Sequence, residues 1–577
     1  MQPITHCMKK HLTLALLSLA SILAAQPDSL TQEYIHGNNI GALLNSNGSL
    51  FWDGGNGHFI AGEDGRSLVR AAGLWIAGVG KAGNLKGAIQ MYNEDGRSDF
   101  VPGLLGDTVN AENWNHIWKV TGEDILLHIR DWETDGVLDD TIASIFGWPG
   151  RGNPFFEQYN GFPLPDINSH QLAPFYDVNL NGVYEPHFGD FPMNDTRSCG
   201  SAPVPAELSW FSFHDNTPHS ESNMAPLQIE VSTEVTAYRC TDNQFANNSL
   251  LLFYKITNLA QEDIDSCYFG VFFDFQIGCP NDDYMATYPE KNIFYAYNSD
   301  GYDEDCSPYN GFHDQPPVVA VTLLRGPRNE FLEELPLSVI MPIHEGSTIP
   351  GQAPPEQPAE YYNYLTGRGK DGIPLTNGGT GYNPGSTDYT NIIFPGRPGM
   401  DTTGWTELNA GTLPGRRRVL ASYGPFTLQP NAVNAIQLII TQIPGTNGPL
   451  LENLDALYDS LFEAFGFLYN GCIDPTPLYP KCTEDIEIPP LPPPPPLPEE
   501  FIISPNPVSK ILTIQIKDPG NVERLSIYDA TGRLVFEKKM LTDVLEIDVA
   551  GWPKGTYFVR LGKGDEQFVK GFVVMRR

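Results

Sequence analysis

The feature that most constrains this chain is a run of prolines near its C-terminal end. Eight of the ten residues from Pro489 to Pro498 are proline. Proline lacks a backbone N–H and has a fixed φ, so such a run adopts polyproline II rather than helix or sheet. It forms a stiff spacer. We therefore predict a linker over residues 483–500 that separates a large body from a small terminal module, residues 501–577.

Composition narrows the class of protein. The 577 residues include 35 Lys and Arg against 70 Asp and Glu, a net charge of −35. A surface this acidic argues against nucleic acid or an anionic membrane as a partner. It suits a soluble extracellular protein that collects divalent cations. Gly (56) and Pro (50) are abundant while charged residues make up only 18%, which is typical of a β-rich protein with many loops.

The N-terminus has the features of a secretion signal, predicted over residues 1–25. Lys9 and Lys10 precede an apolar stretch from Leu12 to Leu23, and cleavage is expected near Ala25. A membrane anchor is the alternative, but the stretch is too short for the ~20 residues that a spanning helix needs. No later segment has 18 consecutive apolar residues, so we expect no transmembrane segment in the mature chain.

Seven cysteines remain after the signal, and an oxidising destination permits disulfides. Cys472 and Cys482 are close in sequence and flank a loop, which makes them the first candidate pair. The weaker candidate pairs are Cys279 with Cys306 and Cys199 with Cys240. Cys267 lies in an apolar run and is expected to be a buried free thiol, because an odd number leaves at least one cysteine unpaired.

The body is predicted to be mainly β, a large β-sandwich with loop insertions. Residues 26–200 form a β-rich, loop-rich region, with a partly helical part around Trp114, Trp118 and Trp132. Residues 201–482 form the sandwich itself. Apolar residues at three-to-four spacing predict one helix over 449–469 that packs on the sandwich and closes the body.

Individual strands are indicated by alternating or dense apolar runs. Leu250 to Ile256 and Tyr268 to Phe275 are dense enough to be central strands of the sandwich. Residues 34–102 suggest short strands joined by tight turns, with a hairpin signal at Asn47-Gly48. A further turn is expected at Gly424-Pro425, between two later strands.

Two segments place oxygen-bearing side chains at relative positions 1, 3, 5 and 9 with Gly at position 6. That spacing is typical of a calcium loop, in which position 7 offers its carbonyl. The alternative is an ordinary turn whose side chains cap local backbone groups. Calcium is thus the expected cofactor. The candidate ligands are Asp177, Asn179, Asn181, Val183 and Glu185 in one segment, and Asp131, Glu133, Asp135 and Asp139 in the other.

The region from 280 to 415 combines acidic loops with aromatic residues. Asp282, Asp283 and Asp303 belong to loops that form either a third cation site or simply a solvated surface. Tyr361, Tyr362 and Tyr364 could stack on sugar rings or anchor their long loop to the body. These loops are the basis of the alternative function, a carbohydrate-active enzyme or glycan-binding protein.

The terminal module shows strand signals every 8 to 12 residues and is predicted to be a small immunoglobulin-like sandwich. It carries Ser504-Pro505-Asn506-Pro507, a central Ile527-to-Val535 segment and Gly555-Thr556-Tyr557. In these motifs and their order it resembles the type A C-terminal sorting domain of the type IX secretion system. The matching motif residues are Pro505, Asn506, Pro507, Tyr528, Gly532, Gly555 and Tyr557.

The body in turn resembles large secreted bacterial exoproteins whose bodies have no assigned activity. The similar phrases are Leu50 to Gly54, Ala72 to Gly78, Ala173 to Asn179 and Tyr254 to Asn258. The two resemblances imply export by the type IX machinery. They also imply removal of the module, and release or attachment to surface lipopolysaccharide of a Gram-negative bacterium.

No HExxH, GxSxG or P-loop motif occurs in the chain, and no catalytic residue is assigned. The sequence therefore favours a secreted or cell-surface protein with a non-enzymatic, structural or adhesive body stabilised by calcium.

Overall fold

The computed structural model describes residues 29–445 and 501–575, with short gaps at 62–64, 93, 108–109, 169–170, 196–203, 240–243, 315, 399–402, 517–521, 523, 530–532, 540–541 and 564–565. Several predictions lie outside the described residues. These are the signal over 1–25, the helix over 449–469, the linker, the pairs Cys472–Cys482 and Cys199–Cys240, and Gly532.

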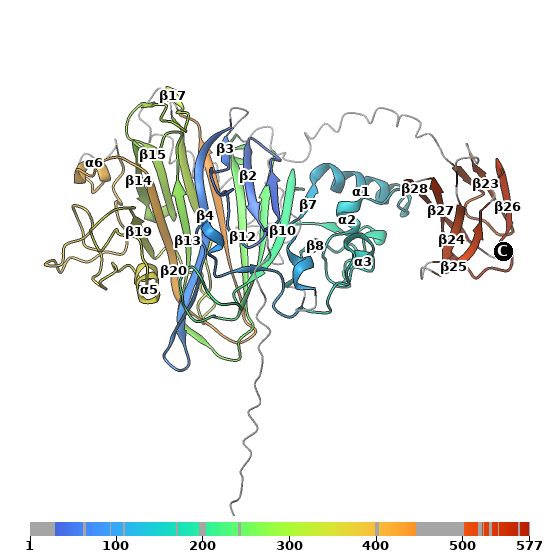
Figure 1. Ribbon diagram of the computed structural model, residues 1–577, viewed down its shortest axis with the longest axis horizontal. Coiled ribbons are helices and arrows are strands. Elements are labelled where there is room, and N and C mark those ends of the chain that lie inside the picture. Colours follow the sequence, from blue (N-terminus) through green and yellow to red (C-terminus); the bar gives the residue numbers. More distant parts are fainter. Residues whose placement is uncertain are drawn as a thin grey trace, which may run out of the picture. The chain divides into compact units, whose positions relative to one another are not determined.

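The chain divides into two compact units, residues 1–486 and 487–577. The first unit contains two large antiparallel sheets (Figure 1). The first sheet has the order β1-β2-β3-β4-β13-β20-β19, with β5 also paired to β4. Its strands are β1 (Gln32–Ile35), β2 (Ile40–Asn45), β3 (Phe59–Ala61), β4 (Arg66–Gly80), β5 (Leu85–Ile89), β13 (Ile264–Phe275), β19 (Val339–Ile343) and β20 (Arg417–Leu428).

The second sheet has the order β14-β15-β18-β21-β12-β11-β10-β6, with β7 also paired to β10. Its strands are β6 (Val101–Pro102), β7 (Trp118–Thr121), β10 (Glu207–His214), β11 (Ile229–Ala237), β12 (Ser249–Asn258), β14 (Asp283–Tyr288), β15 (Ile293–Asn298), β18 (Val318–Arg325) and β21 (Val433–Ile443). Two short pairs complete the body: β8 (Phe175–Tyr176) with β9 (Phe191–Pro192), and β16 (Tyr302–Asp303) with β17 (His313–Asp314).

One continuous apolar core includes residues of both sheets, so the prediction of a mainly β, sandwich-like body is confirmed. On β12 the alternate residues Leu250, Leu252, Tyr254 and Ile256 belong to this core, as the two-residue period of a strand requires. The two densest apolar runs are indeed central strands: β12 lies between β11 and β21, and β13 lies between β4 and β20. Cys267 on β13 is a buried free thiol, as expected.

Residues 103–195 include a partly helical region that shares a separate aromatic core with β10, and this core includes Trp114, Trp118 and Trp210. The expectation of helix here is confirmed. Figure 1 shows its helices at one end of the body and those of residues 346–415 at the other. The helices are α1 (Gly122–Asp135), α2 (Ala143–Phe146), α3 (Phe156–Asn160), α4 (Gln244–Asn247), α5 (Pro358–Leu365) and α6 (Glu407–Ala410).

Three expectations about the body need correction. The N-terminal strands are not all short, since β4 runs for 15 residues. Gly424-Pro425 is not a turn: β20 continues through it, because irregular pairing opposite Cys267 accommodates the residues there. The division drawn at residue 200 falls within one folded unit, because β4 pairs with β13 along most of its length.

The second unit consists of two small sheets that enclose a common core, with the orders β22-β23-β26 and β25-β24-β27-β28. The seven strands are β22 (Phe501–Ser504), β23 (Ile511–Ile516), β24 (Arg524–Asp529), β25 (Leu534–Lys538), β26 (Val544–Asp548), β27 (Gly555–Lys563) and β28 (Glu566–Val574). A small β module is therefore present where the strand signals predicted it.

Candidate functional site

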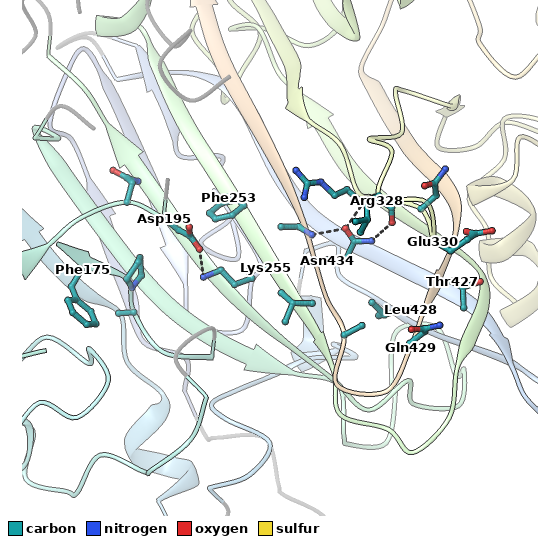
Figure 2. Close-up of a pocket in the computed structure, with 18 residues that line it drawn as sticks. Phe175, Asp195, Phe253, Lys255, Arg328, Glu330, Thr427, Leu428, Gln429 and Asn434 are labelled. Atoms are coloured by element: carbon teal, nitrogen blue, oxygen red, sulfur yellow. Dashed lines mark hydrogen bonds and ion pairs between the residues drawn. The ribbon is translucent and has the colours of Figure 1, made fainter. Parts of the chain in front are cut away.

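The body contains an open groove of about 780 Å³ on the β12–β21 side of the second sheet (Figure 2). Its lining comes from segments far apart in the sequence. Phe253 and Lys255 belong to β12, Asn434 to β21, Arg328 to the turn after β18, and Asp195 to the segment after β9. The groove therefore exists only because the sheet brings these segments together.

An ion pair lies in the groove between Lys255 Nζ and Asp195 Oδ2, at 2.6 Å. The Lys255 side chain is only 8% exposed, so the pair is largely shielded from water. Beside it, Glu234 on β11 is buried and accepts a hydrogen bond from the Asp195 backbone N–H at 2.9 Å. Burial raises the pKa of Glu234 to about 8, although the Lys255 charge opposes the rise. The cluster thus places a buried acid with a raised pKa directly beside the Lys255–Asp195 ion pair.

The far wall of the groove is a turn held in place by Asn434. The side-chain oxygen of Asn434 accepts a hydrogen bond from Arg328 N, and the side-chain amide of Asn434 donates to Arg328 O, both at 2.8 Å. Two apolar side chains at the groove are exposed, Leu332 (75%) and Val433 (41%). The wall therefore offers a fixed turn and an apolar edge beside the charged pair.

The lining side chains suit binding of a polar ligand by hydrogen bonds and charge. Among the described residues that line the groove, Thr427 carries the only hydroxyl group, and it donates to Asp265 at 3.1 Å. Sequence reasoning did not find this groove. A lysine inside the apolar run from Leu250 to Ile256 was the one available signal, since lysine is rarely buried unless paired.

The second candidate calcium segment is a loop, as predicted. Asp177 accepts hydrogen bonds from Asn181 N (3.2 Å) and Gly182 N (2.6 Å). Glu185 accepts from the side-chain amides of Asn181 (2.6 Å) and Asn179 (3.3 Å). Gly182 has a φ of +74°, which the tight turn requires. The side chains of this loop therefore hydrogen-bond within the loop, to its backbone N–H groups and to one another.

Two further residues belong to this loop. Val183, whose carbonyl is the seventh-position candidate, donates its own N–H to Asn181 Oδ1 at 2.7 Å. Asp190, which the pattern did not include, accepts from Val178 N and Glu185 N, both at 2.8 Å. Burial raises the pKa of Asp190, and the Asp177 and Glu185 charges add to the rise.

The first candidate calcium segment is not a loop over its first half, and this prediction is wrong there. Asp131, Glu133 and Asp135 belong to α1. At 100° per residue Glu133 points about 200° away from Asp131, so the three carboxylates cannot converge. Asp131 instead accepts hydrogen bonds from Asp139 N and Asp140 N beyond the helix end. These residues do not fit a calcium loop.

The tyrosines of the 346–415 region contact the body. Tyr361 and Tyr364 are 3% and 0% exposed and belong to the main core. The Tyr361 hydroxyl donates to Glu221 O (3.4 Å) and that of Tyr362 to Ser266 O (2.9 Å), while that of Tyr364 donates to Pro350 O (3.2 Å) within the same region. Of the two roles weighed for these tyrosines, the structure therefore supports anchoring of the loop.

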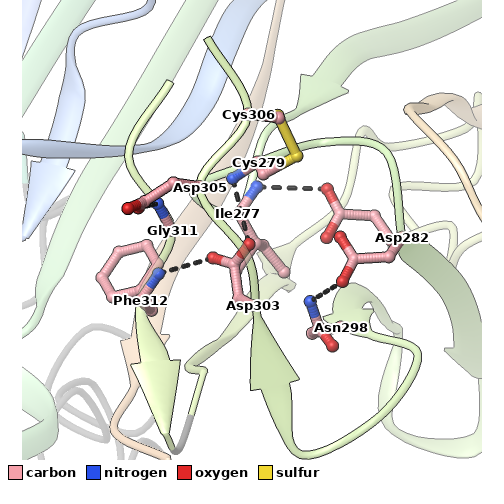
Figure 3. Close-up of a disulfide and its surroundings, with 10 residues drawn as sticks. Ile277, Cys279, Asp282, Asn298, Asp303, Asp305, Cys306, Gly311 and Phe312 are labelled. Atoms are coloured by element: carbon pink, nitrogen blue, oxygen red, sulfur yellow. Dashed lines mark hydrogen bonds between the residues drawn. A yellow bond between two sulfur atoms is a disulfide. The ribbon is translucent and has the colours of Figure 1, made fainter. Parts of the chain in front are cut away.

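The loops around Asp282 and Asp303 are joined by a disulfide between Cys279 and Cys306, with a Cα–Cα distance of 5.5 Å (Figure 3). This pair is one of the two that the sequence ranks below Cys472–Cys482. The disulfide therefore links the segment that contains Asp282 covalently to the segment that contains Asp303.

The sorting motif residues hold the terminal module together. Asn506 Oδ1 accepts a hydrogen bond from Val573 N at 2.9 Å, and Val508 pairs with Val574, so the motif is attached to the last strand. Tyr557 is buried in the core, stacks on Phe572, and donates its hydroxyl to Pro553 O at 2.9 Å. Pro505 and Pro507 flank Asn506 on the surface. Tyr528 is half-buried on β24, and Gly555 begins β27 with a φ of +155°.

A family model described as a secretion system C-terminal sorting domain matches residues 503–575. Residues 503–575 are a sorting domain of this family. The resemblance seen in the motifs is thus confirmed, and the domain implies recognition by the type IX secretion system. The protein is secreted from a Gram-negative bacterium or attached to its outer surface. Among the described residues, no helix is long and apolar enough to cross a membrane.

No curated protein matches the chain. Among solved structures, a polysaccharide lyase is 8% identical, with a TM-score of 0.17. The similarity covers 60% of this chain and 34% of the lyase, so the chain spans about a third of that enzyme's length. At this level the similarity says nothing about activity.

Proposed function

We propose that the body is an adhesive protein of the outer surface or the medium, which binds a polar segment of an extracellular polymer in the β12–β21 groove. The observation that carries the proposal is the groove itself. It combines a shielded Lys255–Asp195 pair with a fixed turn at Arg328 and an apolar edge at Val433. Ligand grooves commonly pair apolar walls with a few well-placed polar groups.

A binding screen with glycans and other extracellular polymers tests this proposal. Val433→Arg places a long charged side chain at the groove, and we expect it to weaken binding about tenfold or more, equivalent to about 1.4 kcal/mol. Leu413→Arg is the matched control, since Leu413 is 83% exposed and does not line the groove. Equal binding by the two variants and the wild type would place the binding site elsewhere.

Calcium at the 177–185 loop belongs to the same proposal. Asp177, Asn179, Asn181 and Glu185 would hold the ion, which would supply positive charge to a loop rich in carboxylates. We expect calcium to raise the midpoint of thermal unfolding and a chelator to lower it, because a ligand that binds only the folded state stabilises it. Asp177→Asn should reduce the difference and Asp166→Asn, a control in the same 103–195 region, should not. An unchanged midpoint in the wild type would exclude calcium here.

Attachment to surface lipopolysaccharide after removal of the terminal module is the finer part of the proposal. It rests on the sorting domain and on the type A motifs within it. Mass analysis of the protein from the cell surface tests it. We expect a chain that ends before Phe501 and carries an added lipopolysaccharide mass, and an unmodified full-length chain would contradict it.

A further inference from the structure

The outer face of the β25-β24-β27-β28 sheet in the terminal module carries a row of apolar side chains. Strand pairing sets Leu534 on β25 opposite Tyr528 on β24, and Tyr528 opposite Phe558 on β27. Their chain neighbours Ile527 and Val559 are 0% exposed and belong to the core. Because successive residues of a strand point to opposite faces of the sheet, the row faces away from the core.

This row, Leu534–Tyr528–Phe558, is open to solvent. Leu534 is 47% exposed and Phe558 is 39% exposed, and Tyr528 is half-buried between them. Phe558 lies opposite Gly571 on the edge strand β28, and Gly571 has no side chain to cover the ring. Three adjacent strands therefore present a contiguous apolar patch, which typically marks an interaction site.

The other sheet of the module has no such row among its described residues. Its exposed apolar residues Ile502 and Val544 both lie opposite Gln515, and Ile511 lies opposite Asp548. Each of these apolar side chains therefore has a polar neighbour on the adjacent strand. Apolar residues scattered in this way are normal on a protein surface, so the row distinguishes one face of the module from the other.

The row beside Leu534–Tyr528–Phe558 on the same face is polar. Arg560 on β27 lies opposite Ser526, which lies opposite Glu537 on β25. Arg560 and Glu537 are exposed, and Ser526 Oγ donates a hydrogen bond to Glu537 Oε1 at 3.3 Å. An apolar centre with aromatic residues and a polar edge is typical of a protein–protein interface.

The row also contains motif residues that the fold of the module does not use. Tyr528 and Leu534 lie in the Ile527-to-Val535 segment, by which the module resembles sorting domains. Two other motif residues have structural roles, since Asn506 accepts a hydrogen bond from the last strand and Tyr557 is buried in the core. The Tyr528 side chain lies outside that core, which suggests a role in recognition rather than in folding.

We propose that the secretion machinery recognises the terminal module through the Leu534–Tyr528–Phe558 row. The sorting domain implies a partner in that machinery. The row fits a protein surface that is apolar at its centre and polar at its edge. This inference concerns the terminal module alone and does not depend on the proposed function of the groove.

Export of the full chain from bacteria that have the type IX system tests the row. Tyr528→Ser and Phe558→Ser each remove an aromatic ring from the outer face. We expect each to weaken recognition about tenfold or more, as loss of a central interface aromatic commonly does, so that the body accumulates in the cell envelope. Ile511→Ser is the matched control, because Ile511 is 37% exposed on the other sheet and should be exported like the wild type.

Gly571→Asp tests the same face without changing the row itself. A Cβ at Gly571 would lie 3.7 Å from Phe558 Cε1, an ordinary contact distance, so the strand accommodates a side chain there. The added carboxylate lies beside the Phe558 ring, and we expect export to fall as in the serine variants. This variant keeps the test decisive if a serine variant destabilises the module, and calorimetry of each full chain shows whether the module still unfolds as a separate transition.

Normal export of Gly571→Asp and of both serine variants would overturn the proposal. So would an equal loss of export in Ile511→Ser, since the effect would then not be specific to this face. Normal export with a changed oligomeric state in sedimentation would assign the row to contact with a second copy of the chain. Normal export with a shifted unfolding transition of the body would assign the row to contact with the body, and either result would contradict recognition by the machinery.

Discussion

At the scale of single residues, identical side-chain types serve different purposes according to their surroundings. The same oxygen spacing occurs in the segments that begin at Asp131 and Asp177, yet one lies on a helix and the other in a loop. Thr121 caps α1 by accepting a hydrogen bond from Asp124 N at 3.1 Å, and Gly136 ends the helix with a φ of +74°. The capping signals, rather than the oxygen spacing, decided the structure.

Tyr364 provides a test of what the aromatic residues of the 346–415 region do. Its hydroxyl donates to Pro350 O and Ala353 O, so Tyr364→Phe leaves two carbonyls without this donor. We expect the free energy of unfolding to fall by about 1 kcal/mol. Chemical denaturation of the body measures the change.

Tyr389→Phe is the matched control, because Tyr389 is 55% exposed and should change stability by less than about 0.5 kcal/mol. If Tyr364→Phe is as stable as this control, the Tyr364 hydroxyl does not stabilise the structure of the 346–415 region.

At the scale of elements, the sequence predicted strands better than it predicted where loops contact them. The dense runs at Leu250 to Ile256 and Tyr268 to Phe275 are central strands because each is buried on both faces. The groove could not be predicted, since Lys255, Arg328 and Asn434 are brought together only by strand order. Asp282 and Asp303 were visible as acidic residues, but the burial of Asp303 beside the Cys279–Cys306 disulfide was not.

The contact between β11 and the 103–195 region should respond to pH through Glu230. Its carboxylate accepts hydrogen bonds from Leu105 N (2.8 Å) and Gln171 Nε2 (3.0 Å). Burial nevertheless raises its pKa from 4.5 to about 7. Between pH 4.5 and about 7 the folded protein keeps a proton on Glu230 that the unfolded chain releases. The stability that Glu230 contributes is therefore complete below about pH 4.5 and is lost as the pH rises to about 7.

Glu230→Gln should therefore reduce the loss of stability across this range, by up to about 3 kcal/mol. Denaturation curves at several pH values measure it. Glu157→Gln, an exposed position of the same 103–195 region, should keep the wild-type pH dependence. A slope that is the same in all three proteins would show that Glu230 has an ordinary pKa.

At the scale of the whole molecule, the proline run predicted the division into two units, and the motif order predicted what the second unit is. The function of the body was not predictable in the same way. Its resemblance is to proteins without assigned activity, and its groove has no local sequence motif. The sequence therefore established where the protein goes more firmly than what it binds.

Two units with separate cores should unfold in two separate transitions. Asn506→Ala removes the acceptor for Val573 N and should cost the terminal module about 1 kcal/mol. For a domain of this size we expect its midpoint to fall by about 4–8 °C, with the transition of the body unchanged. Ser509→Ala is the exposed control in calorimetry of the full chain. A shift of both transitions by Asn506→Ala would mean that the units are energetically coupled.

The most direct test of the two-part account is the amount of body that reaches the cell surface or the medium with and without residues 501–577. The measurement compares cells that produce the full chain with cells that produce a chain ending at residue 500. We expect the full chain to deliver the body to the outside, and the shortened chain to leave it folded inside the cell envelope. Equal amounts outside the cell for both chains would contradict the assignment of the export signal to the terminal module.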